Sequence, residues 1–157
     1  MKVERICTPK IATIERNRSV REAAQAMARE HVGALLVRER TVQGLQVAGI
    51  VTDRDLVLLA LAEPMDPDAV AVEKVMSPVV VSIGIDADLL EAVAVMRDAG
   101  VRRLMVTDAQ GAPCGLLSFD DVIDGLAAEL ADAAALMRAE ARREAGGFSP
   151  APLRVAR

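Results

Sequence analysis

The chain contains 157 residues, of which 52% are hydrophobic and 27% charged, so it can bury a core and is not a disordered polypeptide. Its formal net charge of -4 argues against a broad electrostatic surface for DNA, RNA or an anionic membrane. The absence of Trp and Tyr, with only two Phe, excludes recognition of nucleic acid by stacking bases on several aromatic rings. Any anionic ligand must therefore be held locally.

Membrane insertion, secretion and metal binding have little support in the sequence. The longest stretch without a charge, residues 41–52, is far short of the ~20 apolar residues of a membrane span. Residues 1–10 carry four charges and lack the apolar region of a signal peptide, so we expect a cytoplasmic protein. Cys7, Cys114 and His31 are the only thiols and imidazole, and their spacing fits neither a zinc site nor a Cys-His pair. We predict no metal and no membrane partner.

The sequence repeats itself once. In the first part of the repeat, equivalent residues are 69 positions apart, as Met27 and Met96 are. Farther along the separation falls to 66, as between Gly49 and Gly115. The missing three residues lie between two apolar segments, in a stretch that contains turn-forming glycine. We therefore expect a hairpin loop to absorb the difference.

Each copy predicts the same series of elements: strand, helix, strand, strand, helix. In the first copy Ser19-x-x-Glu22 is a capping box that begins an amphipathic helix. In the second copy Asp86 or Asp88 can cap the equivalent helix. The predicted elements are an extended segment over residues 10–14, the capped helix, strands over 34–37 and 47–51, a helix over 53–62, an extended segment over 79–83, a helix over 89–99, strands over 104–106 and 115–117, and a helix from 119.

These elements divide the chain into two units and an extension. Between the copies lie two prolines and three acids, a composition typical of a linker. After the second copy the helical pattern continues to about Ala145, where two glycines end it. A unit of about 60 residues has a marginal core, so we expect the copies to cover one another. The predicted boundaries are 3–62 for the first repeat, 63–71 for the linker, 72–127 for the second repeat, 128–145 for the helical extension and 146–157 for a disordered tail.

In each copy a hydroxyl residue at the end of the last strand is followed three positions later by a carboxylate. The pairs are Thr52 with Asp55 and Ser118 with Asp121. One interpretation is structural, because a hydroxyl at the N-cap and an acid at N3 stabilise a helix start by ~1 kcal/mol. The other is functional, because free N–H groups at a helix start can bind phosphate and a carboxylate can accept hydrogen bonds from ribose hydroxyls. The residues alone leave both open.

The repeat order, the opening segment after a proline and the paired strand-to-helix motifs together resemble a tandem pair of CBS domains (named for cystathionine beta-synthase), a Bateman module. The resemblance extends over roughly residues 3–127. It implies an α/β (α+β) fold in which two β-α-β-β-α repeats pack sheet to sheet with pseudo-twofold symmetry. It also implies a homodimer that needs no cofactor and binds an adenosyl small molecule, such as AMP, ADP or ATP, as a regulatory ligand between the repeats.

The ligand contacts of that family imply a first cleft built from both copies. Thr52 and Asp55 would hold the ribose and lie near the phosphate, opposite the opening segment of the second copy, which would contact the adenine. Arg102 and Arg103 would face the phosphates, because guanidinium groups bind phosphate in a bidentate manner. The predicted residues are Thr52, Arg54, Asp55, Val79, Val80, Val81, Arg102 and Arg103.

The second cleft departs from a phosphate-binding pattern. Gly33 and Ala34 stand where Arg102 and Arg103 stand in the other copy. We therefore predict a site that is weaker, empty or suited to an uncharged adenosyl group. Its predicted residues are Ile11, Ala12, Thr13, Ser118 and Asp121.

The leading hypothesis is a non-catalytic cytoplasmic sensor that signals to an unidentified protein effector. The alternative is a ligand-free dimerisation or protein-interaction module with vestigial clefts, for which the helix over residues 122–145 offers a surface. An enzyme is not expected, because the sequence contains no nucleophile-base pair and no Walker-type phosphate loop.

Overall fold

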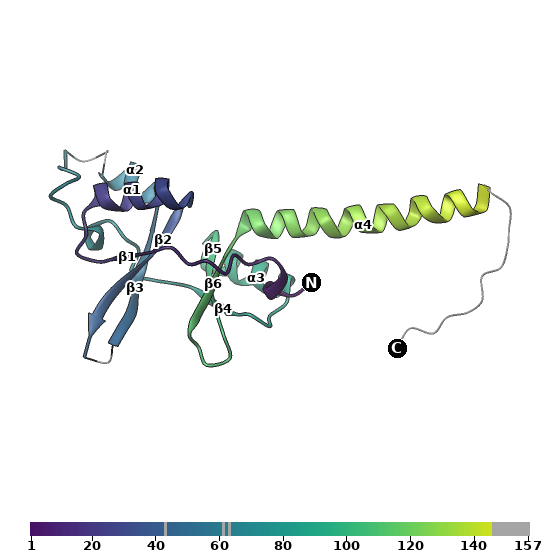
Figure 1. Ribbon diagram of the computed structural model, residues 1–157, viewed down its shortest axis with the longest axis horizontal. Coiled ribbons are helices and arrows are strands. Elements are labelled where there is room, and N and C mark those ends of the chain that lie inside the picture. The colour runs from purple at the N-terminus through teal and green to yellow at the C-terminus, as the bar shows by residue number, and fades with distance from the viewer. Residues whose placement is uncertain (43, 61, 63, 146–157) are drawn as a thin grey trace.

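The computed structural model describes residues 1–42, 44–60, 62 and 64–145. It contains two three-stranded sheets, each accompanied by helices, and a long C-terminal helix (Figure 1). The α+β class expected from the sequence is confirmed. In chain order the elements are η1 (Val3–Arg5), β1 (Thr13–Glu15), α1 (Val20–Glu30), β2 (Ala34–Thr41), β3 (Gly44–Thr52), α2 (Asp53–Ala60), η2 (Val72–Lys74), β4 (Ser82–Gly84), α3 (Leu89–Ala99), β5 (Arg103–Thr107), β6 (Pro113–Ser118) and α4 (Phe119–Ala145).

The two sheets have the same topology. β1 is parallel to β2, which pairs antiparallel with β3, and β4, β5 and β6 repeat this arrangement. The strands β2 and β3 contain 8 and 9 residues, whereas β5 and β6 contain 5 and 6. The first hairpin is therefore the longer one, which accounts for the change of spacing between the copies.

The ends of the two equivalent helices α1 and α3 differ between the copies. Ser19 caps α1 in a complete capping box with Glu22, whereas Asp88 precedes α3 without a side-chain capping bond. At the other end, His31 adopts a left-handed conformation (φ 55°) where α3 has Gly100 (φ 65°). A left-handed backbone costs a residue with a side chain about 1 kcal/mol, so His31 is an unfavourable end for α1. The helix α2 ends at Ala60, two residues before the predicted end.

The short 3-10 helix at the start of each copy, η1 or η2, packs into the core of the other copy. Val3 is fully buried in the second core, with Leu104 and Val122. Val72 is fully buried in the first core, with Leu35. Burial of apolar side chains is a main source of stability, and each core includes such a side chain from the other copy. Neither copy therefore has a complete core of its own.

Backbone hydrogen bonds repeat this exchange with pseudo-twofold symmetry. The N–H of Glu4 donates to the carbonyl of Ile85 at 3.0 Å, and the N–H of Glu73 donates to the carbonyl of Arg16 at 3.1 Å. Isolated bridges also occur in matching pairs. They join Lys2 to Asp88 and Ser19 to Ala71, and they join Thr8 to Leu116 and Ile50 to Ser77.

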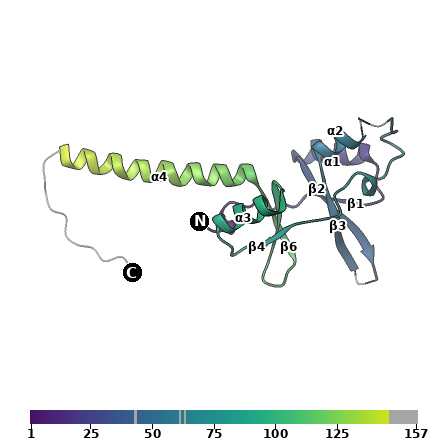
Figure 2. The same cartoon turned by 180° about the vertical axis from the view of Figure 1, so that it is seen from behind.

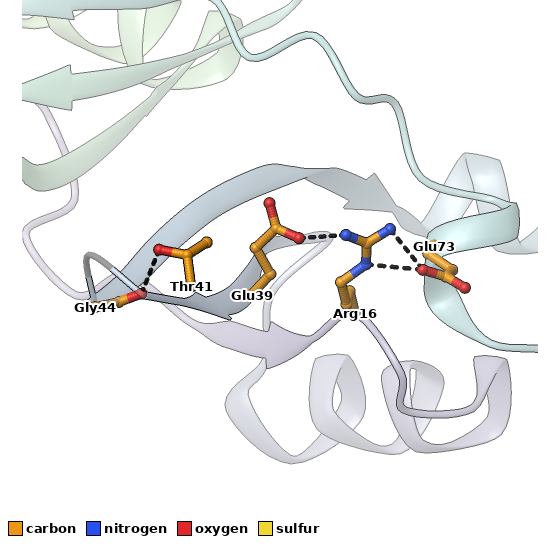
Figure 3. A network of polar contacts seen from close by, with 5 residues as sticks. All are labelled: Arg16, Glu39, Thr41, Gly44 and Glu73. Atoms are coloured by element: carbon orange, nitrogen blue, oxygen red, sulfur yellow. Dashed lines mark hydrogen bonds and ion pairs between the residues drawn. The ribbon is translucent and has the colours of Figure 1, made fainter.

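Arg16 fastens the exchanged segment η2 to the first sheet. Its Nε donates to Glu73 Oε2 at 2.7 Å, and Nη1 pairs with Glu39 on β2 (Figure 3). The hydrogen bonds to Glu39 and, to a smaller extent, to Glu73 raise the pKa of the Arg16 guanidinium above its ordinary value. At the end of the same hairpin, the Thr41 hydroxyl donates to the Gly44 carbonyl at 3.0 Å.

The helix α4 leaves the rest of the molecule after its first turns (Figures 1 and 2). Its start packs closely on the N-terminal segment, since a Cβ on Gly125 would lie only 3.0 Å from Ile6 Cγ2. From Leu126 to Ala145 every side chain is exposed except that of Ala134, which is half-buried. The tail predicted over 146–157 lies outside the described residues.

Candidate functional site

The larger of the two clefts predicted from the sequence lies where α2 begins opposite the start of β5. It has a volume of about 620 Å³. All eight residues predicted for the first cleft line it, and the sequence reasoning missed nine others. The additional residues are Ile50, Asp53, Ser77, Gly100, Val101, Met105, Ser118, Phe119 and Asp120.

Thr52 and Asp55 form a compact cap at the start of α2. Asp55 Oδ2 accepts hydrogen bonds from both the Thr52 N–H and its hydroxyl, each at 2.8 Å. The Asp55 N–H donates back to Thr52 Oγ1 at 3.2 Å. The two bonds that the carboxylate accepts both end on Oδ2, so Oδ1 of Asp55 takes no part in these capping bonds. Capping and ligand binding are therefore compatible in this geometry.

The opposite wall comes from the second copy. Val79 is 69% exposed, and together with Val80 and Val81 it gives the cleft an aliphatic side. Such a wall can cover one flat apolar face of a ligand without any aromatic ring. It begins one residue after Ser77-Pro78, where the bridge to Ile50 brings the two copies together.

The charges around this cleft balance within the protein. Arg54, Arg102 and Arg103 lie on its lining together with Asp53 and Asp120, in addition to Asp55. Arg102 Nη2 is 3.5 Å from Asp120 Oδ1, and both side chains are exposed. An exposed ion pair of this kind contributes little stability, so a phosphate can displace the carboxylate at small cost.

The second cleft is smaller, with a volume of about 240 Å³. Its cap repeats the first one: Asp121 Oδ2 accepts from the Ser118 N–H at 2.7 Å and from the Ser118 hydroxyl at 2.6 Å. Four of the five predicted residues line this cleft. The lining consists of Thr8, Lys10, Ile11, Ala12, Val32, Gly33, Ala34, Leu36, Arg103, Leu116, Ser118, Asp120 and Asp121.

Thr13 is the predicted residue that does not line the second cleft. It starts β1, pairs with Leu36 and lines a separate hollow between the two hairpins. The reason is a displacement of one position: the 69-residue spacing makes residues 10–12, not 11–13, equivalent to 79–81. The omitted residue is Lys10, whose ammonium lies 2.7 Å from Glu30 and lowers the pKa of that carboxyl.

Arg103 borders both clefts. A Cβ built on Gly33 would lie 3.2 Å from Arg103 Nη2 and 3.0 Å from Asp53 Oδ2, so the guanidinium reaches across the first copy at this glycine. The second cleft thus shares a cation with the first, although the first copy has Ala34 at the position equivalent to Arg103. The lining of the cleft and the close approach at Gly33 both show this, and the sequence contains no local signal for it.

Within the part of the chain that the structure describes, no group of three or more His, Cys, Asp or Glu side chains could hold a metal ion. None of the described helices is long and apolar enough to cross a membrane.

Comparison with known proteins agrees with this architecture. A family model of the CBS domain matches residues 3–61 and 72–128. The CBS domain-containing protein YhcV of Bacillus subtilis is 33% identical over 115 residues, which is 73% of this chain and 78% of YhcV. Protein MK0525 of Methanopyrus kandleri is 30% identical over 102 residues, 65% of this chain, and the matched region spans only 50% of MK0525.

A solved structure shares the fold. The crystal structure of the CBS domain protein TA0289 from Thermoplasma acidophilum matches with a TM-score of 0.70 at 24% identity, covering 79% of this chain and 68% of that one. Two matched domains, two equivalent sheets and reciprocal bridges between them lead to one conclusion: the chain belongs to the CBS domain family and carries two copies of the domain in tandem.

Proposed function

We propose that this chain is a non-catalytic regulatory module that binds an adenosine-containing ligand in the larger cleft. The observation that carries the proposal is that Thr52 and Asp55 of one repeat line the same cleft as Arg102 and Arg103 of the other. This cleft has a volume of about 620 Å³. A volume of this size suits one nucleotide-sized ligand.

Each part of an adenine nucleotide has a chemically suitable partner in this cleft. The ribose hydroxyls can donate to Asp55 Oδ1, and the phosphates can reach the guanidinium groups of Arg102 and Arg103. The adenine can lie against Val79 to Val81. AMP, ADP, ATP and related adenosyl compounds all fit this description, with phosphate number and charge as the difference among them. The proposal needs no cofactor.

The second cleft is proposed as a weaker site. It is smaller, and one of its two cations, Lys10, is already paired with Glu30. The other, Arg103, also lines the larger cleft, so the smaller cleft suits an uncharged adenosyl group better than a nucleotide with several phosphates.

The proposal includes a homodimer in the cytoplasm that passes its signal to a protein effector. The cytoplasm keeps thiols such as Cys7 and Cys114 reduced, and both are free here. A ligand-free interaction module is the second candidate. It is favoured by the Arg102–Asp120 pair, which closes the cation side with the protein's own carboxylate.

Thermal unfolding with and without ligands tests the proposal. Because a ligand of the folded state stabilises it by mass action, AMP, ADP, ATP or an adenosyl compound at 100 times its Kd should add about 2.7 kcal/mol. Pyrophosphate and the guanine nucleotides serve as controls for charge alone and for the base. If no adenosyl compound shifts the melting temperature or gives calorimetric heat at millimolar concentration, the interaction module is the better description.

A further inference from the structure

The far part of α4 lies outside the region that the family model matches, which ends at residue 128. It projects from the two sheets as a single helix (Figure 1) and still carries large apolar side chains. Leu130 and Met137 are each 71% exposed, and Ile123 is 48% exposed. A helix of this length with an apolar stripe and no neighbour is poorly stabilised in water, so the stripe has the character of a contact surface.

The apolar residues of α4 follow a heptad pattern. Ile123, Leu130 and Met137 recur every seventh residue, and so do the small residues Ala127, Ala134 and Ala141. The two sets alternate at spacings of four and three, which places them on one seam of the helix, as the a and d positions of a coiled coil are placed. Alanine at every a position lets a second helix approach closely.

The charges of α4 are unevenly distributed along the helix. Its first half carries only acids, whereas its second half carries Arg138, Arg142 and Arg143 together with Glu140 and Glu144. Asp124 and Arg138 flank the seam on the same side, both at the e position, and neither has an ion-pair partner within the described residues. In an antiparallel pair the e positions of the two helices face each other, which brings Asp124 beside Arg138, whereas in a parallel pair e faces g, where Phe119 and Ala133 offer no opposite charge.

We propose that α4 pairs with α4 of a second copy of this chain in an antiparallel two-helix coiled coil, related by a twofold axis near Asp132. In this register each large residue meets an alanine of the other copy. The layers are Ile123 with Ala141, Leu130 with Ala134, and Met137 with Ala127. The helices overlap over residues 123–141, about 28 Å at 1.5 Å per residue.

Charge fixes the direction of the pair. On each side of the axis, Asp124 of one copy lies beside Arg138 of the other, because e positions face each other across an antiparallel pair. The twofold symmetry produces this ion pair twice. The two-sheet bodies then lie at opposite ends of the helix pair.

Charge reversal in the full chain tests this pairing by sedimentation equilibrium. Asp124→Arg and Arg138→Asp should each weaken association about tenfold or more, because each places two like-charged pairs across the interface. Mixing the two single variants in equal amounts should restore association, because every 124–138 contact in the mixed pair is then Arg with Asp. The double variant D124R/R138D should associate like the original chain.

Matched controls make the same charge changes away from the seam. Asp132→Arg lies on the outer face of α4 and Arg142→Asp lies off the seam, so both should change association less than twofold. Circular dichroism and melting temperature verify that every variant is folded. The proposal is overturned if the single reversals leave association unchanged, if the mixture fails to restore it, or if the control variants weaken it equally.

Discussion

Removing the Asp55 carboxylate separates the two roles that its geometry permits. Asp55→Ala deletes the acceptor of two hydrogen bonds from Thr52, each 2.8 Å long. The second copy offers a matched control, because Asp121→Ala deletes an acceptor with the same partners at 2.7 and 2.6 Å from Ser118. As caps the two carboxylates are equivalent, whereas as ligand groups they belong to clefts of different size.

The structure supports a magnitude for each effect. Loss of such a cap costs about 1 kcal/mol, and a chain of this length loses about 2–4 °C of melting temperature per kcal/mol. Both variants should therefore melt a few degrees lower without ligand. At a ligand concentration of 100 times the wild-type Kd, the unmodified chain gains about 2.7 kcal/mol. If Asp55→Ala weakens binding about 50-fold, as loss of charge-assisted hydrogen bonds to a ribose implies, less than about 1 kcal/mol of that gain remains.

Differential scanning fluorimetry with and without the adenosyl ligand measures both effects in one experiment. We expect the ligand-induced shift to shrink severalfold for Asp55→Ala and to persist in full for Asp121→Ala. Equal retention of the shift in both variants would refute the ligand role of Asp55 and leave the cap alone. Equal loss in both would refute the distinction between a strong and a weak cleft.

Other predictions concern backbone geometry and acid stability. Gly49→Ala should destabilise the fold by about 1–3 kcal/mol, because its Cβ would come 2.5 Å from a backbone carbonyl oxygen. Gly115→Ala should destabilise the fold less, since the nearest backbone oxygen is 3.1 Å away. Chemical denaturation measures the free energy of unfolding of both variants. His31→Gly should stabilise by about 1 kcal/mol by relieving the left-handed residue at the end of α1, and an unchanged denaturation midpoint would contradict this. The Ser19 N–H lowers the pKa of Glu22, so Glu22 stabilises the fold above its unfolded pKa of about 4.3 and loses this effect as pH falls through that range. The stability difference between the original chain and Glu22→Gln should therefore be present at pH 7 and decrease as pH falls below about 4.3.

Helices and hairpins were predictable because their signals are local. The capping box at Ser19 and the glycine that ends α3 lie beside the elements they delimit, and α3 spans the predicted residues 89–99. The first cleft could be predicted because the repeat places Thr52 and Asp55 in a motif whose family contacts are known. The structure brings these residues together with Arg102 and Arg103, and the ligand itself stays a prediction.

Features that depend on distant contacts could not be predicted in this way. An apolar pattern shows that Val3 and Val72 are buried, but it does not tell which of two similar cores receives them. In the same way, Arg103 reaches the second cleft through the space left by Gly33, a contact between copies that has no signature along the chain. The displacement that omitted Lys10 was avoidable, because the repeat spacing itself contains the correct equivalence.

The exchange of η1 and η2 between the two cores has a consequence for the synthesis of this protein on the ribosome. Val3 is synthesised first, yet its binding partners Leu104 and Val122 come late in translation. The first repeat must likewise wait for Val72, which follows its last helix α2. The first core is therefore complete once Val75 has been synthesised, whereas Val3 remains without its packing partners until β5, β6 and the start of α4 have followed.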